Sequence, residues 1–368
     1  MIILHTITRG SGGGTMRALE KSISYEREQG HEVWIASGNP HNSDVNHLYV
    51  RYLKREINFL ADMLAFLELR KIVAKIHPDM IHSHESKAGA LTRLLCYIRK
   101  KPVYVHTVHM ATFHSKNNST SQRIFSWIER IMAKKTDFLV FVSPALKTIF
   151  ESRNILPAKS ALVIRSRVNI EKFRERRDLR SHDHRIFTDQ LGLSESVKII
   201  LVVGLLEPRK RPQFILKELS NVIAEDHSIF LVFLGDGQLR QHLERLAAEL
   251  NISSKTRFLG FESDIEKYVS GSDVIVIAST FEGFPQIALQ ASAAGTPIVA
   301  TNLEEYLGSS IFRIISSDES MAEVVLEVLT SSNSHLSTEN PEIEHWKTKV
   351  IDEEHKILLD WVSECLRR

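Results

Sequence analysis

The chain has 368 residues, of which 43% are hydrophobic, and its formal net charge is +2. This length predicts roughly two to three domains, and no tract reaches the ~18 apolar residues that a membrane span needs. The chain begins with the strand-like run MIILHTI, so no secretory signal peptide is expected. The two cysteines, Cys96 and Cys365, form no spaced framework, which favours a cytoplasmic protein.

Apolar runs with strand character alternate with segments of helical spacing along the chain. The expected strands are 2–8, 32–36, 79–82, 103–107, 137–142, 161–165, 197–203, 228–234, 256–259, 273–277, 297–300 and 312–315. The expected helices are 15–29, 56–76, 87–99, 121–134, 211–225, 238–250 and 319–330. This alternation predicts an α/β fold of parallel sheets covered on both faces. Twelve strands exceed one typical open sheet, so we expect two doubly wound domains.

The charged stretch 170–193 lacks a sustained apolar period and precedes a new strand, so we interpret it as a linker. The first domain is then 1–175 and the second is 176–341. The tail from about 342 to 368 has helix-like spacing and is expected to pack on the first domain. Ligands of open parallel sheets bind outside the carboxyl ends of the strands. Two such edges facing each other would hold a donor and an acceptor together.

The most informative run is STFEGFPQIALQASAAGTPIVAT, residues 279–301. It places Glu282 after a strand, a helix start near Gln286, and Gln290 eight positions after Glu282. A carboxylate there either accepts hydrogen bonds from a ligand or interacts only with the helix dipole.

A glycine run that includes Gly13 and Gly14 follows the first strand and precedes a helix. Such a run either lets backbone N–H groups approach an anion or forms only a tight turn. Thr15 breaks the dinucleotide-binding pattern, so a nicotinamide enzyme is not expected.

The chain resembles family 4 of the retaining glycosyltransferases in the order and spacing of successive motifs. Beside the run at 279–301, these motifs are RGSGGGTMRALEKSISYEREQGHEVWIAS, IHPDMIHSHESKAGALTRLL, PVYVHTVHM, ERIMAKKTDFLVFVSPAL, ALVIRSRVNIEKF, ILVVGLLEPRKRPQFILKEL, IFLVFLGDGQLRQHLERLAAELNI and TRFLGF. The resemblance implies a GT-B fold, in which two Rossmann-like domains face each other across a cleft. The C-terminal domain would then bind most of the donor nucleotide, and the N-terminal domain would lie on the acceptor side.

The resemblance also implies a reaction. A sugar would move from a nucleoside diphosphate sugar to a carbohydrate or lipid-linked acceptor with retention, in the synthesis of a surface glycan. Lys210 would stabilise the departing diphosphate. Glu282 and His109 would position the sugar, with N–H groups around Gly283 and Phe284 assisting. The alternative for His109 is a histidine bonded only to the backbone. No metal or other cofactor and no nucleic-acid partner are expected.

Four positions depart from the family pattern: Leu205, Arg211, Gln290 and Arg167. Leu205 stands where the family has arginine, and Arg211 where it has glycine. We expect Arg209 or Arg211 to restore the missing charge, although both fit a solvated turn as well. Gln290 replaces a glutamate that holds the ribose, and it either forms a weaker neutral bond or faces solvent. Arg167 either contacts an anionic substrate or is a loop substitution without functional effect.

These departures leave a second function open, in which the chain is a catalytically silent homologue that acts as a binding or partner subunit. A sugar-nucleotide epimerase of the same fold is a third reading. The two histidines in IHSHES, His82 and His84, alternate along a strand end, so their spacing allows a shared metal. No Cys or Asp cluster accompanies them, so the sequence predicts no metal site.

Residues 1–175 hold 27 Lys and Arg against 15 Asp and Glu, a balance of +12, whereas the rest of the chain balances to −10. The basic half either meets an anionic surface or acceptor or carries ordinary solvated charge. The segments 51–76 and 121–135 mix apolar and basic residues. They either lie on an anionic membrane at its inner face or turn their apolar sides to the core.

Overall fold

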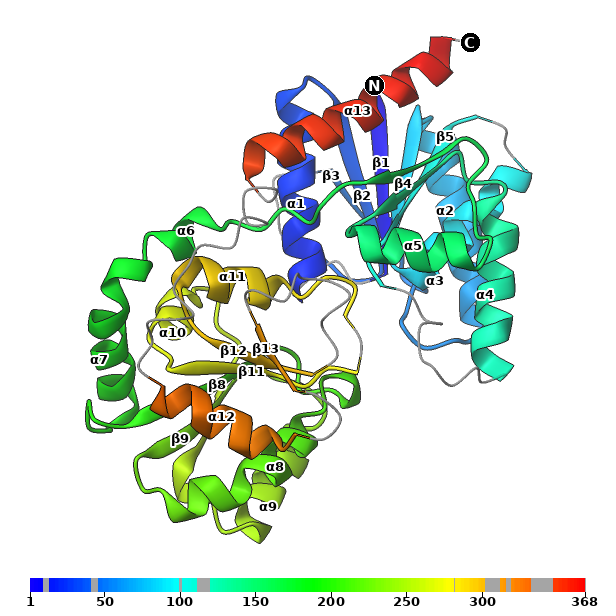
Figure 1. Ribbon diagram of the computed structural model, residues 1–368. Helices are drawn as coiled ribbons and strands as arrows, with labels where there is room; N and C mark the ends of the chain where they lie inside the picture. Colours follow the sequence, from blue (N-terminus) through cyan, green and yellow to red (C-terminus); the bar gives the residue numbers. More distant parts are fainter. Residues whose placement is uncertain are drawn as a thin grey trace. The chain divides into compact units, whose positions relative to one another are not determined.

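The computed structural model describes residues 1–8, 13–40, 46–98, 101–110, 120–280, 282–301, 312–315, 319–331 and 347–367. The chain divides into two units, Met1–Arg167 with Thr348–Arg368, and Val168–Lys347. The first unit thus ends eight residues earlier than the boundary expected after residue 175. Figure 1 shows both units with their elements labelled.

The first unit contains a sheet of seven parallel strands among its described residues, in the order β3-β2-β1-β4-β5-β6-β7. These strands are β1 (Ile2–Ile7), β2 (Glu32–Ser37), β3 (Asn46–Tyr49), β4 (Met80–His84), β5 (Val103–Val108), β6 (Phe138–Phe141) and β7 (Ser160–Val163). The strand order reverses direction between β1 and β4, and ligands of such sheets bind at this switch point. The sequence did not predict strand β3, because only Leu48 and Tyr49 of its four residues are hydrophobic.

Helices cover both faces of this sheet. They are α1 (Gly13–Glu28), α2 (Phe59–Ile76), α3 (Ser86–Leu94), η1 (Leu95–Tyr97), α4 (Thr120–Ala133), α5 (Pro144–Ser152) and α13 (Thr348–Arg367). One hydrophobic core joins β1, β4 and β5 to α1 and α13, which lie on the same face in Figure 1. A second core joins the other face to α2 and α3. The helix at the end of the chain therefore completes the core of the first unit.

The second unit contains a sheet of six parallel strands among its described residues, in the order β10-β9-β8-β11-β12-β13. The strands are β8 (Lys198–Val203), β9 (Ile229–Leu234), β10 (Thr256–Gly260), β11 (Val274–Ile277), β12 (Ile298–Ala300) and β13 (Phe312–Ile314). All twelve expected strands thus occur, with ends shifted by at most two residues. The order reverses between β8 and β11.

The helical elements of the second unit flank both faces of its sheet. They are α6 (Glu171–Arg174), η2 (Arg177–Leu179), α7 (Arg180–Leu191), η3 (Pro208–Lys210), α8 (Pro212–Glu225), α9 (Arg240–Glu249), η4 (Ser253–Lys255), α10 (Glu266–Ser270), α11 (Gln286–Ala294) and α12 (Met321–Thr330). Helices α8, α9 and α12 share one core on the sheet. No helix of the described segments is both long and apolar enough to span a membrane.

The interpretation of 170–193 as a linker is wrong, because α7 packs into the second unit. Phe187 is buried and meets the Tyr268 ring edge-on at 4.9 Å between centroids. Asp183 is also buried, and it forms an ion pair with Arg176 at 3.1 Å and accepts a bond from Ser270. The helix lacked a hydrophobic period because part of its buried side is polar and hydrogen-bonded.

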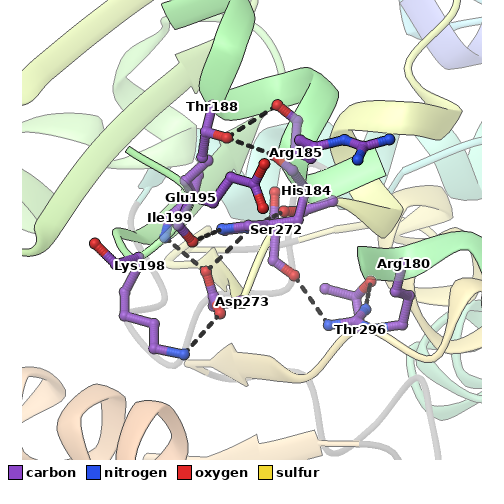
Figure 2. Close-up of polar contacts among 12 residues, drawn as sticks. Arg180, His184, Arg185, Thr188, Glu195, Lys198, Ile199, Ser272, Asp273 and Thr296 are labelled. Atoms are coloured by element: carbon purple, nitrogen blue, oxygen red, sulfur yellow. Dashed lines mark hydrogen bonds and ion pairs between the residues drawn. The ribbon is translucent and has the colours of Figure 1, made fainter. Parts of the chain in front are cut away.

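Polar contacts tie α7 to the amino-terminal ends of the sheet strands (Figure 2). Arg180 donates to the hydroxyl of Thr296 at 2.5 Å and to the carbonyl of Ser272 at 3.1 Å. Asp273 accepts from the backbone N–H of Ile199 at 2.8 Å. The opposite, carboxyl ends of β8 and β11 therefore remain available for a ligand.

The loops that follow β8 and β9 approach each other closely at glycines. Gly235 has a φ of +146°, and a Cβ added there would collide with the carbonyl oxygen of Gly204. Gly237 approaches the backbone of Leu206 in the same way. Backbone bonds from Gly204 to Leu234 and from Leu206 to Asp236 lock the two loops together. These close approaches and hydrogen bonds thus fix the position of the loop after β8.

Gly235→Ala should lower the free energy of unfolding by about 1–3 kcal/mol, because overpacking forces the backbone apart and positive φ strains a side chain. Urea denaturation would measure the change. The matched control is Gly192→Ala, whose Cβ would meet nothing within 4 Å at a φ of +67°. Equal destabilisation by both variants would contradict the close approach of the loops.

Candidate functional site

The switch point of the second sheet carries a pocket. Its lining comes from the ends of β8 and β11 and from α8 and α11, namely residues 202–206, 276–279, Lys210, Pro212, Ile215 and Ile287. Ligands of doubly wound sheets bind in this place, outside the carboxyl ends of the strands at the reversal of strand order. The charged residues that the sequence singled out in the second half lie beside it.

Glu282 is buried and is held by two cations from the loop after β8. Its Oε1 lies 2.5 Å from Nζ of Lys210, and its Oε2 accepts from Nη1 of Arg209 at 3.0 Å. The other terminal nitrogen of Arg209 donates to Glu207 at 2.9 Å. Two positive and two negative side chains thus form one balanced cluster. The structure brings together Lys210, Glu282 and Arg209, which the sequence placed in one site.

The electrostatics of the cluster keep Glu282 ionised. Burial by itself would raise the pKa of Glu282, but the charges of Lys210 and Arg209 lower it below its ordinary value. Burial likewise opposes the charge of Arg209, whereas Glu282 and Glu207 raise its pKa. A carboxylate in this state accepts hydrogen bonds and cannot donate one.

The difference in unfolding free energy between the wild type and Glu282→Gln should depend on pH. A carboxyl with a lowered folded pKa contributes stability that is fully present above its unfolded pKa of about 4.3. That contribution is lost as the pH falls through the folded pKa. The stability advantage of the wild type should therefore be largest near neutral pH and shrink below about pH 4.3. Urea denaturation at several pH values measures the unfolding free energy of both proteins. A difference between them that grows in acid would contradict the ion pairs.

Local backbone structure explains how these side chains meet. Pro208 begins the short helix η3, which places Arg209 and Lys210 in one turn. The carbonyl of Arg209 accepts from the backbone N–H of Thr280 at 3.0 Å, so the loops after β8 and β11 are joined. Arg211 then adopts a left-handed conformation with φ 52°, and its guanidinium lies 3.9 Å from the centre of the Phe214 ring. Of the two candidate replacements for the missing arginine, Arg209 is therefore the one paired with Glu282.

The remaining predicted residues of the second unit lie around α11 and β8. Gly283 and Phe284 are buried in the loop that leads into α11. Gln290 is half-buried within α11, one turn beyond Gln286. Leu205 lines the pocket with its side chain 41% exposed. Leu205 thus contributes an apolar side chain, and no charge, to the lining of the pocket.

The predicted residues of the first unit follow the carboxyl ends of β1 and β5. Gly13 and Gly14 begin α1, whereas residues 9–12 lie outside the described residues. His109 follows β5 and is half-buried, and its Nε2 lies 3.2 Å from Nδ1 of His84. Burial lowers the pKa of His109 to about 4, so its imidazole is neutral at pH 7. The partner of His109 among the described residues is thus a side chain rather than the backbone.

Arg167 does not match either of the alternatives expected for it. Its buried guanidinium pairs with Asp352 of α13, lies 3.4 Å from Nδ1 of His355, and stacks 4.6 Å from the centre of the Tyr25 ring. Arg167 is therefore bound to α1 and α13, and the arginine attaches the last helix to the first unit. The sequence could not indicate this role because its partners lie about 140 to 190 positions away.

His355 contacts a buried carboxylate that was not predicted from the sequence either. Glu26 of α1 accepts from His5 Nε2 at 2.7 Å with one oxygen and contacts His355 Nε2 at 3.0 Å with the other. Burial alone would raise the pKa of Glu26, but His5 and His355 lower it far below its usual range. The only sequence signal was a single carboxylate on the apolar side of an expected helix.

Two family models match the chain in succession. The model "Glycosyltransferase Family 4" matches residues 12–172, and the model "Glycosyl transferases group 1" matches residues 183–335. The chain belongs to the family 4 glycosyltransferases. The family resemblance drawn from the motifs is thereby confirmed.

Two relatives of this family 4 glycosyltransferase are similar over part of their length. The first is the UDP-Gal:alpha-D-GlcNAc-diphosphoundecaprenol alpha-1,3-galactosyltransferase of Escherichia coli, 29% identical over 71% of this chain and 67% of that protein. The second is an uncharacterized glycosyltransferase of Methanocaldococcus jannaschii, 29% identical over 61% of this chain and 58% of its own length. The chain thus matches about three fifths to two thirds of these relatives.

Solved structures establish the fold of the family 4 glycosyltransferase. Sucrose-phosphate synthase from Thermosynechococcus elongatus has a TM-score of 0.81 at 18% identity, with 99% of each chain covered. Anabaena HepE in complex with UDP-glucose has a TM-score of 0.76 at 16% identity, with 98% of this chain and 99% of that chain covered. The glycosyltransferase WaaG also reaches 0.76, at 15% identity over 98% of this chain and 99% of that chain. The expected GT-B fold of two parallel-sheet α/β domains is confirmed.

Proposed function

We propose that this protein transfers a sugar from a nucleoside diphosphate sugar to a carbohydrate or lipid-linked acceptor, with retention at the anomeric carbon. The observation that carries the proposal is the cluster of Lys210, Arg209 and Glu282 beside the switch-point pocket of the second unit. Cations at such a site suit a diphosphate, and an ionised carboxylate suits sugar hydroxyls. The family membership of the chain supports the same reaction class.

The proposed reaction is a front-face displacement. The acceptor hydroxyl forms a bond to the anomeric carbon as the bond from that carbon to the diphosphate oxygen breaks, and the leaving phosphate takes the proton of the hydroxyl. Lys210 stabilises the charge that develops on the diphosphate, and Glu282 and His109 position the sugar. Gly13, Gly14, Gly283 and Phe284 would contribute backbone N–H groups. The displacement itself uses no bound metal.

The ion pairs of the site suggest how it would hold a donor. Glu282 neutralises Lys210 and Arg209, so the two cations are held in position without an uncompensated charge. An ammonium group has three donors, so Lys210 can contact a phosphate oxygen while it remains near Glu282. Arg209 would keep Glu282 ionised throughout. Side chains held by such ion pairs need less ordering when a ligand binds.

Calorimetry tests the proposal with UDP, GDP and ADP and the corresponding sugar nucleotides. We expect a uridine nucleotide to bind, since the E. coli relative is named for UDP-Gal and HepE was solved with UDP-glucose. Product analysis by NMR would then show an anomeric configuration equal to that of the donor. Failure of every nucleotide to bind would contradict the enzymatic function and leave the silent homologue. Binding without transfer to any glycan or lipid-linked acceptor would favour that homologue as well.

Gln290→Glu should tighten binding of the nucleoside diphosphate about 3- to 10-fold, because a charged acceptor holds ribose hydroxyls more strongly than a neutral one. Calorimetry measures the dissociation constant. Gln241→Glu, on the exposed surface of α9, is the matched control and should not change the affinity. An unchanged affinity in Gln290→Glu would remove Gln290 from the ribose site.

We also propose that the first unit binds an anionic membrane surface through α2 and α4. The exposed side of α2 and the residues before it form an apolar stripe, here called the α2 stripe, that comprises Ile57, Phe59, Leu60, Met63, Leu64 and Leu67. Phe59 is 82% exposed, and Lys54 and Arg55 precede the stripe. Helix α4 adds the exposed Trp127 and a hollow that Arg123, Arg130 and Arg153 help to line. Apolar residues flanked by cations are typical of proteins that lie on anionic lipid.

Sedimentation with vesicles tests the membrane proposal. The protein should bind phosphatidylglycerol vesicles at low salt and bind phosphatidylcholine vesicles much less. Phe59→Ser with Leu60→Ser should abolish binding. Ile357→Ser with Leu366→Ser, which replaces exposed apolar residues of α13, is the matched control. Binding that is equal for both lipids, or equal in both variants, would contradict the proposal.

A further inference from the structure

Three histidines from two neighbouring strands meet in the interior of the first unit. His5 of β1 pairs in register with His82 of β4, and His84 lies two residues further on the same face of β4. Their side chains are 0%, 4% and 4% exposed. One ring nitrogen of each lies within 4.8 Å of those of the other two. The cluster therefore gathers three imidazoles in a volume that water does not reach freely.

One nitrogen of each ring is bonded to a partner outside the trio, and the partner differs for each histidine. His5 Nε2 bonds to Glu26 at 2.7 Å, His82 Nε2 to the hydroxyl of Thr107 at 2.7 Å, and His84 Nδ1 to His109 at 3.2 Å. Metal-ligating histidines almost always donate their second ring N–H to a carboxylate, a backbone carbonyl or water, which fixes the tautomer and the ring orientation. Glu26 is such a carboxylate for His5, and a hydroxyl and an imidazole hold the other two rings.

The remaining nitrogen of each ring is not held by these three partners. His5 Nδ1 and His84 Nε2 lie 3.0 Å apart and can share one proton. His82 Nδ1 is buried and has no hydrogen-bond partner among the described residues. An unsatisfied buried polar atom is unfavourable and calls for an explanation, such as an ion. A cation at the centre would satisfy all three nitrogens at once.

We propose that His5, His82 and His84 bind a divalent transition metal ion, with Zn²⁺ as the best match, at a site that adjoins His109 through His84. Imidazole ligands suit zinc, copper, iron and nickel rather than calcium or magnesium. Three histidines with a fourth position for water form a common tetrahedral arrangement. Glu26 supplies the carboxylate behind His5, and its charge partly balances that of the ion.

The distances between the ring nitrogens suit a zinc ion once the three rings move slightly closer together. Ligand nitrogens about 2.0–2.1 Å from a tetrahedral zinc stand roughly 3.3 Å apart. The distance between His5 Nδ1 and His84 Nε2 is 3.0 Å. The widest pair has to close by at most about 1.5 Å, which small rotations of the rings can provide. The ion would then tie β1 to β4 and, through His84, hold His109 at the end of β5.

The proposed site departs from the expectation that the chain binds no metal. That expectation rested on the family resemblance and on the pair His82 and His84, which no Cys or Asp cluster accompanies. The third ligand, His5, lies 77 positions earlier in the sequence. Only the register of β1 against β4 brings it beside His82. A search for closely spaced ligands in the sequence therefore could not detect the trio.

The first experiment uses the full chain without a histidine tag. The protein is treated with a chelator, dialysed against Zn²⁺ or Co²⁺, and analysed for bound metal by mass spectrometry. We expect one bound equivalent, a visible absorption spectrum of tetrahedral Co²⁺, and a thermal midpoint raised by Zn²⁺. A protein that retains no metal, or a cobalt spectrum like that of the aqueous ion, would overturn the proposal and leave an ordered water in the cluster.

Two variants locate the bound metal. His82→Gln should abolish binding, and Thr107→Val should weaken it about 10- to 100-fold, the usual effect of losing a partner behind a ligand. Thr107→Val keeps all three ligands and serves even if His82→Gln fails to fold. His242→Gln, on the exposed surface of α9, is the matched control and should bind normally. Binding that is unchanged in Thr107→Val would place the metal elsewhere and overturn the assignment.

Discussion

Lys210→Ala should lower kcat for sugar transfer by a factor of about 10²–10³, the usual effect of removing one donor that stabilises a developing negative charge. Lys210 ends η3, and its ammonium group is held 2.5 Å from Glu282 beside the switch-point pocket. The charge on the diphosphate grows as the bond to the sugar breaks. The interaction therefore strengthens towards the transition state, and kcat should fall more than the KM for the donor rises.

Steady-state kinetics with the donor identified by calorimetry would measure the loss. Lys217→Ala is the matched control, because Lys217 is an exposed lysine of the adjacent helix α8. It should leave both constants unchanged. An increase in KM with normal kcat in Lys210→Ala would mean that the lysine binds donor and transition state equally, and its assignment to the leaving group would be wrong.

The two sheets and the second-unit cluster were largely predictable from the sequence. Buried parallel strands are short continuous apolar runs, such as 229–234, which stand out against polar helix ends. Lys210 and Glu282 were identified because each follows such a strand and belongs to a recognisable motif. Their ion pair itself was not predicted, since it depends on the adjacency of β8 and β11 in the sheet.

Other features depended on contacts that sequence spacing does not encode. Helix α7 was missed because polar residues such as Asp183 are buried with partners on its packed side. Arg211 was considered a source of charge, but its backbone is left-handed, with φ 52°. Glycine adopts this conformation without strain, whereas any other side chain adopts it at a cost. The side chain of Arg211 then stacks on Phe214.

The second large effect is expected at Glu26, where α1, β1 and α13 are joined by one buried carboxylate. Its two oxygens contact His5 of β1 and His355 of α13 at 2.7 and 3.0 Å. Glu26→Gln should lower the free energy of unfolding by about 3–5 kcal/mol, because removal of one partner leaves the others buried and unsatisfied. The amide can accept from only one of the two histidines, and its NH₂ group would face the ring of the other.

Urea denaturation in the presence of a chelator would measure this effect without a contribution from any bound metal. Glu28→Gln, at an exposed position of the same helix, is the matched control and should change stability by less than about 0.5 kcal/mol. Hydrogen exchange should show where the energy is lost. Because Glu26 reaches His355, amides of α13 should exchange faster in Glu26→Gln than in Glu28→Gln. If α13 were equally protected in both variants, the shared hydrophobic core and the Arg167–Asp352 ion pair would hold the helix without Glu26, and the buried network would then serve to orient His5 rather than to attach the helix.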